Sequence, residues 1–257
     1  MTLKNYESSV DKVVKIAKEL LGKQSIKVLV EVGARDCRET LSFYKLLPNA
    51  NIYTFECNPQ TLPDCRAAVK NKPRINLIEK AVSNVTGIIK FYPINPSKTI
   101  TTWANGNPGA SSIFKASGKY PVEKYIQDEI EVESIRLEDF IKENSIDTID
   151  LMWMDIQGAE LLALKGLGDR IQQLKLVYLE IEFFEIYKDQ PLYDDLRAFL
   201  NKKGFLLVGF TNIGKYSGDA IFVNGKYFDN YFKKLKCNIL NQYTHLKYKA
   251  YRIVSFV

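Results

Sequence analysis

The sequence predicts an α/β fold, with a doubly wound, mostly parallel sheet of seven strands that ends in an antiparallel strand. Short, nearly continuous apolar runs alternate with helical patterns, which is typical of strands buried on both faces. The last two apolar runs are joined by a Gly-containing turn too short for a helical crossover, so we expect them to pair antiparallel. With 257 residues, 46% of them hydrophobic, the chain can bury a core of its own.

The elements are expected in a regular order. Apolar residues recur at helical spacing from Val10 to Leu21 and predict an amphipathic helix that ends near Gly22. A short helix is expected over 137–143, and residues 93–128, rich in Pro, Asn, Gly and Ser, predict a functional loop region. The seven core strands are expected at 28–32, 51–56, 75–82, 149–155, 176–183, 205–210 and 219–223, with two further strands at 86–92 and 129–135.

The net charge of +6 is concentrated at the C-terminal end. Residues 224–257 hold seven Lys and Arg, one acid and eight aromatic residues, and the rest of the chain carries no net charge. We therefore expect an N-terminal amphipathic helix (1–25), a main domain (26–223) and a basic aromatic tail (224–257). Such a tail can cover the body or bind single-stranded nucleic acid, and we favour the cover because the body is neutral.

The composition also excludes several classes of protein. The single histidine, His245, lies in the tail, which excludes multi-histidine metal sites and Ser-His-Asp catalysis in the body. The four cysteines show no CxxC spacing, as expected for reduced thiols. No apolar run approaches the roughly 20 residues of a membrane span, and the N-terminus lacks a signal-peptide pattern. We expect a soluble cytoplasmic protein.

Acidic residues recur where the predicted strands end, at the edge of an open parallel sheet where ligands bind. Gly33 follows the first strand and permits close approach, and Glu56, 23 residues later, suits the two hydroxyls of a ribose. A dinucleotide is not expected, because the stretch GARDCR has one glycine and the acidic Asp36 in place of G-x-G-x-x-G. S-adenosylmethionine, with a sulfonium and an ammonium group, would be favoured by these acids.

Six pieces of the sequence resemble the FkbM family of S-adenosylmethionine-dependent methyltransferases. The most specific is IDLMWMDIQGAELLALKGL at 149–167, and the others are VEVGARD, FECNP, AVSN, SSIF and VESIRLEDFI. The resemblance covers roughly residues 26–223 and implies a methyltransferase domain with a Rossmann-like class I fold and S-adenosyl-L-methionine as cofactor. The chain departs from the family pattern at Trp153, Gln157 and Cys37, where the family usually has Lys, an acid and often Gly.

Motifs and strand ends together give the expected cofactor site. Glu56 should hold the ribose, and Glu31, inside an apolar strand, should be hydrogen-bonded to loop backbone or to the methionine moiety. Arg35 and Asp36 either contact the cofactor or cap the following helix. The cofactor-binding residues that we expect are Glu31, Gly33, Ala34, Arg35, Asp36, Glu56, Cys57, Asn58, Ala81, Val82, Ser83, Ser112, Asp155, Ile156 and Gln157.

Asp155 is the expected catalytic residue, together with Glu182. Methyl transfer to a hydroxyl is an in-line displacement, and a carboxylate near the acceptor oxygen can take its proton. Either acid could be the base, or the two could hold a divalent cation; we expect no metal. Trp153 could stack on a sugar ring, but a buried structural role is favoured, and Glu160 should support the start of the following helix.

The expected function is O-methylation of a sugar or glycan hydroxyl on a small molecule, and this acceptor class is implied by the family resemblance. One alternative is an RNA ribose 2′-O-methyltransferase that uses the basic tail, with binding that weakens steeply with salt. Another is a binding module that keeps the fold with impaired catalysis, as the changes at Trp153 and Gln157 would allow. We expect a small-molecule or glycan acceptor, no nucleic-acid partner and no membrane span.

Overall fold

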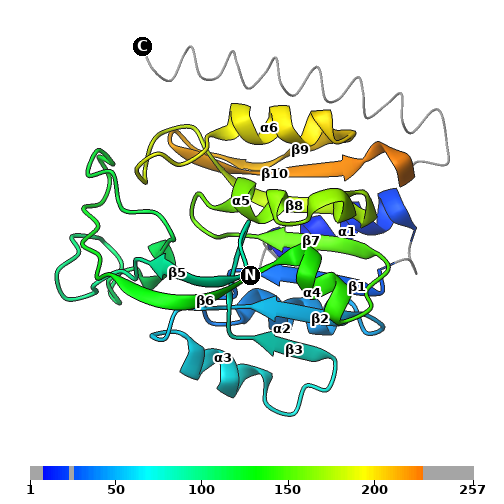
Figure 1. The fold of residues 1–257 in the computed structure, drawn as a ribbon, viewed down its shortest axis with the longest axis horizontal. Helices are drawn as coiled ribbons and strands as arrows, with labels where there is room; N and C mark the ends of the chain where they lie inside the picture. The colour runs from blue at the N-terminus through cyan, green and yellow to red at the C-terminus, as the bar shows by residue number, and fades with distance from the viewer. Residues whose placement is uncertain (1–7, 23–25, 228–257) are drawn as a thin grey trace, which may run out of the picture.

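The computed structural model describes residues 8–22 and 26–227. A seven-stranded sheet crosses the centre of the molecule in the order β3-β2-β1-β7-β8-β10-β9 (Figure 1). All neighbours pair parallel except β10, which is antiparallel to both β8 and β9. The strands are β1 (Val28–Val32), β2 (Asn51–Phe55), β3 (Ile75–Ile78), β7 (Ile149–Met154), β8 (Leu174–Glu182), β9 (Phe205–Ile213) and β10 (Ser217–Asn224). The predicted fold class is confirmed.

Helices cover both faces of this sheet because its strands are apolar on both sides. Every residue of β7 is buried. One core joins α4, α5 and α6 to the sheet face that carries Val30, and a second joins α1 and α2 to the face that carries Leu29. The helices are α1 (Ser9–Leu21), α2 (Arg38–Leu46), α3 (Leu62–Val69), α4 (Leu137–Glu143), α5 (Glu160–Lys165) and α6 (Tyr193–Lys202), with 3₁₀ turns η1 (Pro108–Ala110), η2 (Gly168–Gln173) and η3 (Gly225–Tyr227).

A second, three-stranded sheet lies beside the first, in the order β4-β6-β5, and was not expected (Figure 1). Its strands are β4 (Ala81–Ser83), β5 (Gly87–Phe91) and β6 (Ile130–Arg136). The single strand expected over 75–82 is therefore wrong: the chain leaves the large sheet after β3, and Ala81 pairs with Ser134 of β6. Residues 93–128, between β5 and β6, contain only η1 and isolated bridges, as expected for a loop region.

The predicted end of the N-terminal helix near Gly22 is confirmed. Helix α1 ends at Leu21, and the backbone N–H of Gly22 donates to the carbonyl of Lys18. Residues 228–257 lie outside the described part of the chain, so the expected roles of the tail stay predictions. Among the helices of the described residues, none combines the length and the apolar character that crossing a membrane requires.

Candidate active site

A first cavity opens at the carboxyl ends of β1, β2 and β7, where an open α/β sheet binds its ligands. Its empty volume, open solvent included, is about 570 Å³. Ten of the expected cofactor residues line it: Gly33, Arg35, Glu56, Cys57, Asn58, Ala81, Val82, Ser112, Asp155 and Ile156.

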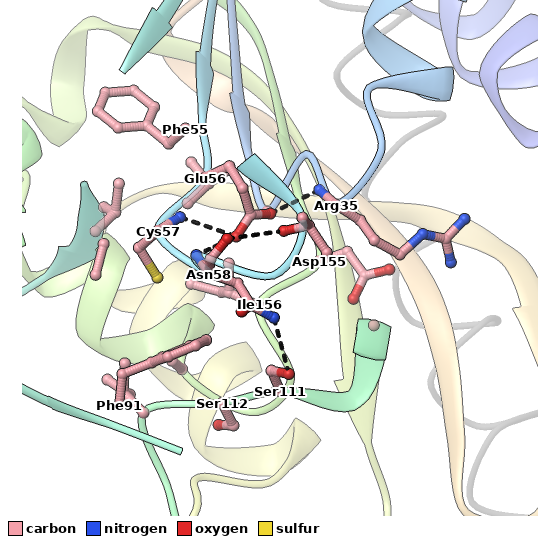
Figure 2. A pocket seen from close by; sticks show the side chains of 18 of the residues that line it. Arg35, Phe55, Glu56, Cys57, Asn58, Phe91, Ser111, Ser112, Asp155 and Ile156 are labelled. Atoms are coloured by element: carbon pink, nitrogen blue, oxygen red, sulfur yellow. Dashed lines mark hydrogen bonds between the residues drawn. The ribbon is translucent and has the colours of Figure 1, made fainter. Parts of the chain in front are cut away.

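Glu56 is held rigidly at the edge of this cavity (Figure 2). Its Oε2 accepts the backbone N–H of Arg35 at 2.7 Å, and its Oε1 accepts the N–H groups of Cys57 at 2.8 Å and Asn58 at 2.7 Å. The side chain is 9% exposed, and its burial raises its pKa while these hydrogen bonds oppose the rise. The carboxyl group is therefore fixed in place and still faces the cavity.

Gly33 directly follows β1 and lies against Asp155, the residue that directly follows β7. Its φ is +90°, and a Cβ there would stand 1.9 Å from the carbonyl oxygen of Asp155. The Asp155 N–H in turn donates to the carbonyl of Val32 at 3.0 Å. Only glycine fits this backbone contact, which sets Asp155 directly beside the first loop.

A second cavity adjoins the first and shares four residues with it. Its volume is about 830 Å³. Aromatic, amide and acidic side chains make up most of its lining, with Arg35 as the basic residue. The shared residues are Gly33, Arg35, Gly109 and Asp155, and the others are Glu39, Trp103, Asn107, Ala110, Tyr125, Trp153, Gln157 and Glu180.

Asp155 stands at the junction of the two cavities and is exposed to them. The side-chain amide of Gln157 donates to Asp155 Oδ1 at 2.7 Å and to Glu180 Oε2 at 2.6 Å. The oxygen of the same amide contacts the Tyr187 hydroxyl at 2.9 Å, and the Gln157 carbonyl accepts from Ser112 at 2.8 Å. One glutamine thus links two carboxyl groups and ties them to the loop region.

Glu180 and Glu182 have different surroundings although they share a face of β8. Burial, followed by the negative charge of Asp155, raises the pKa of Glu180 well above its ordinary value. Glu182 is 1% exposed and lines neither cavity. The expectation that Asp155 and Glu182 face one crevice is wrong in this respect: Met154 pairs with Leu179, so the residue beside Asp155 is Glu180.

Glu31 also differs from expectation. Its Oε2 accepts the hydroxyls of Thr40 and, at 2.8 Å, Thr54, in place of loop backbone or a ligand, and it lines neither cavity. Burial raises its pKa to about 7. Ala34, Asp36 and Ser83 also lie outside both cavities, and Gln157 lines the second cavity only.

Trp153 and Glu160 have the structural roles that were expected of them. Trp153 is 6% exposed and stacks on Tyr178 with ring centroids 3.7 Å apart, although it contributes to the second cavity. Glu160 is fully buried at the start of α5, and its Oε1 accepts the N–H of Ile156 at 2.9 Å.

Within the described ranges, no three His, Cys, Asp or Glu side chains are grouped so as to hold a metal ion.

The family profile described as "Methyltransferase FkbM domain" matches residues 31–207. The chain belongs to the FkbM methyltransferase family. A relative from Sinorhizobium fredii, the 2-O-methyltransferase NoeI, is 29% identical over 208 residues, which cover 77% of this chain and 80% of the relative.

Solved structures resemble this FkbM methyltransferase at lower identity. A putative O-methyltransferase from Klebsiella pneumoniae is 11% identical, with a TM-score of 0.47 over 86% of this chain and 83% of that chain. A precorrin-6y C5,15-methyltransferase from Geobacter metallireducens is 14% identical, with a TM-score of 0.44 over 87% and 93%.

Several residues of this FkbM methyltransferase site were missed from the sequence. Phe91, at the end of β5, and Ile113 add apolar surface to the first cavity, and Lys80 adds a charge. Trp103 and Tyr125 line the second cavity from within residues 93–128. Only the length and composition of that segment pointed to a function, because no strand or helix pattern fixes the position of a single loop side chain.

Proposed function

We propose that this protein transfers a methyl group from S-adenosyl-L-methionine to a hydroxyl group of a sugar, on a small molecule or glycan. One observation carries the proposal: a cavity lined by the expected cofactor residues and a second, polar cavity meet at the carboxylate of Asp155. A group bound in the first cavity and an acceptor in the second would thus lie on either side of one base. The 2-O-methyltransferase relative supports a hydroxyl as the acceptor.

The first cavity fits a nucleoside cofactor. S-adenosyl-L-methionine would supply an electrophilic methyl group on a sulfonium. Glu56 has its carboxyl group fixed by three backbone donors and would accept hydrogen bonds from the ribose hydroxyls. Val82, Phe91 and Ile113 offer an apolar lining for the adenine, and Asp155 would favour the positive charge of the sulfonium.

The second cavity supplies what a hydroxyl acceptor needs. As the carbon–sulfur bond breaks and the carbon–oxygen bond forms, the acceptor oxygen loses a proton, which Asp155 would take. Gln157 orients the Asp155 carboxylate through its amide. Because the pKa of Glu180 is raised, this neighbour can keep its proton and leave Asp155 as the base. The released sulfide is neutral, so charge balances.

The chemistry of the second cavity disfavours the RNA alternative. Glu39 and Asp155 line it with Arg35 as the single cationic residue of the lining, and their carboxylates would repel a phosphate backbone. The impaired-module alternative rested partly on Gln157. The Gln157 amide, which stands where the family usually has an acid, donates to both Asp155 and Glu180 and holds the two carboxyl groups in place. This argues against impaired catalysis.

Calorimetry with S-adenosyl-L-homocysteine and transfer of a labelled methyl group test the proposal. We expect binding of the demethylated product, and labelling of at least one of a set of methyl pyranosides (glucoside, galactoside, mannoside and fucoside). Asp155→Asn should lower kcat at least a hundredfold, within the range for loss of a general base. Asp128→Asn, which changes an exposed acid away from both cavities, is the control.

The outcomes separate the hypotheses. No binding at millimolar product would contradict the function as a whole. Binding without transfer to any pyranoside would favour the impaired module, and labelling of RNA with a steep salt dependence would favour the RNA enzyme. Full turnover in Asp155→Asn would remove Asp155 as the base.

A further inference from the structure

Residues 93–128 leave the three-stranded sheet and return to it at nearly the same place. The N–H of Asp128 donates to the carbonyl of Pro93 at 2.9 Å, and Ile94 bridges to Gln127. Between these ends the segment supplies five residues to the second cavity, three of them with large side chains. We call Trp103, Asn107 and Tyr125 the acceptor wall.

The acceptor wall has little support from a core. Trp103 is 56% exposed, and Asn107 has a left-handed backbone with φ of +58°. Tyr125 is half-buried and stacks on Tyr187, with centroids 6.1 Å apart. Ordering such side chains costs conformational entropy, so polar contacts are needed to hold them in one arrangement.

One carboxylate, that of Glu123, connects to all three members. Its Oε2 accepts from Asn107 Nδ2 at 3.0 Å and from the Tyr125 hydroxyl at 2.6 Å. Its Oε1 accepts from the hydroxyl of Thr101, whose oxygen accepts the backbone N–H of Trp103 at 3.1 Å. Glu123 itself does not line the second cavity. It therefore acts on that cavity only through other residues.

We propose that Glu123 is the positioning residue of the acceptor wall, and that it sets Trp103, Asn107 and Tyr125 to receive a pyranose ring. This deepens the proposed function and rests on it. The aromatic rings offer flat apolar surfaces to the C–H face of a sugar, and the amide of Asn107 offers hydrogen bonds to its hydroxyls. Charge-assisted bonds to a carboxylate are the stronger kind, which suits one residue that must hold three.

The kinetic test compares Glu123→Ala and Glu123→Gln in the full chain. With whichever methyl pyranoside of the set is methylated as the probe, Glu123→Ala should raise the acceptor KM at least tenfold. Its kcat should change less than threefold, and the Kd for S-adenosyl-L-homocysteine less than twofold. Glu123→Gln should lie between it and the parent, because one of its two terminal atoms can no longer accept.

Glu129→Ala is the matched control, because Glu129 is also an acid beside this segment that pairs with two side chains, those of Lys90 and Lys115. It should leave the acceptor KM unchanged. An unchanged KM in Glu123→Ala would overturn the proposal. The proposal would also be overturned if Glu123→Ala weakened S-adenosyl-L-homocysteine binding by the same factor as it raised the acceptor KM. That result would mean that Glu123 supports the structure as a whole.

A second readout needs no turnover. The chain has two tryptophans, Trp103 in the acceptor wall and Trp153 in the large sheet. In protein labelled with 5-fluorotryptophan, Glu123→Ala should shift or broaden the ¹⁹F resonance of Trp103 and leave that of Trp153 in place. Trp103→Phe assigns the signals. An unmoved Trp103 resonance would overturn the positioning role of Glu123.

The two tests also keep the hypotheses apart. The proposed function fails if both tests on the parent protein are negative, that is, if no pyranoside is methylated and none shifts the Trp103 resonance. A sugar is then also ruled out as the occupant of the acceptor wall. The response of the Trp103 resonance to Glu123→Ala still decides whether Glu123 sets that wall.

Discussion

The side-chain amide of Gln157 lies 2.6 Å from Oε2 of Glu180 and donates to it. The same nitrogen donates to Asp155 at 2.7 Å, so a single amide group serves two neighbouring carboxyl groups. Gln157 holds this position with a φ of +55°, an unusual conformation for a residue with a side chain. The Gln157 amide and the carboxyl groups of Asp155 and Glu180 therefore form one hydrogen-bonded group. A substitution that adds a negative charge to this group should lower activity.

Gln157→Glu should lower kcat at least tenfold, which corresponds to about 1.4 kcal/mol. The substitution removes the donor and places a third carboxyl group against Asp155 and Glu180. Adding Glu180→Gln should restore part of the activity, because a donor returns to the pair. Steady-state kinetics of the single and double variants would check this coupling. Purely additive losses would mean that the two side chains act independently.

Gly33→Ala should abolish measurable binding of S-adenosyl-L-homocysteine and lower Tm. A Cβ at this position would overlap the carbonyl oxygen of Asp155, and φ at +90° strains any residue other than glycine. Gly209→Ala is the control, because a Cβ there would meet no atom within 4 Å. Calorimetry and thermal unfolding measure both effects. Normal affinity in Gly33→Ala would mean that the two strand ends can separate without cost.

Glu56→Ala should weaken S-adenosyl-L-homocysteine binding at least tenfold, about 1.4 kcal/mol. The lost carboxyl group is the one that faces the first cavity from β2 and that receives the N–H of Arg35. Glu79→Ala removes an exposed acid that pairs with Arg66 and should leave the affinity unchanged. Calorimetric titration of both variants is the measurement, and equal affinity of Glu56→Ala and the parent would refute the ribose contact.

The stability of the protein should fall as pH rises from about 4.5 to about 7. The pKa of Glu31 is raised from 4.5 to about 7 in the folded chain, chiefly by burial, so in this window the folded state holds a proton that the unfolded state has released. The full effect is about 3 kcal/mol. Its buried Oε1 has no hydrogen-bond partner, which fits a neutral acid.

Glu31→Gln should flatten this dependence. Denaturant unfolding at pH 5, 6, 7 and 8 would show the variant gaining on the parent as pH rises. Glu160, whose pKa is also raised to about 7 by burial, adds a parallel slope, so the comparison is made between variant and parent at each pH. An identical slope in both proteins would mean that Glu31 is ionised when folded.

The pattern of apolar residues was sufficient to predict the large sheet. It failed where a strand pairs with a strand far along the chain. Residues 75–82 look like one strand, and the division at Glu79 and Lys80 follows from the pairing of Ala81 with Ser134, far along the chain. Helix α4 was predicted to the residue, and its C-terminal end is closed locally, since the N–H of Asn144 donates to the carbonyl of Phe140. Local periodicity determines the type of an element but not its sheet.

Site prediction had the same limit. Glu56 and Asp155 were found because they follow buried strands directly. Glu180 and Glu182 share a face of β8, and the choice between them depends on the register Met154 to Leu179, which a sequence pattern does not contain. Trp103, Asn107 and Tyr125 sit in irregular chain and could be placed only by the fold.

The hydrogen bond from Asp128 to the carbonyl of Pro93 closes a narrow neck at the base of residues 93–128. All of the acceptor wall lies within the segment that this neck closes, and so do Ser112 and Ile113 of the first cavity. Glu56 and the strands of the large sheet lie outside this segment. We therefore expect insertions, deletions or exchanges within residues 93–128 to leave the register of the large sheet unchanged. A graft of this segment between relatives should therefore change the lining of both cavities at once and leave the strand ends of the large sheet in place.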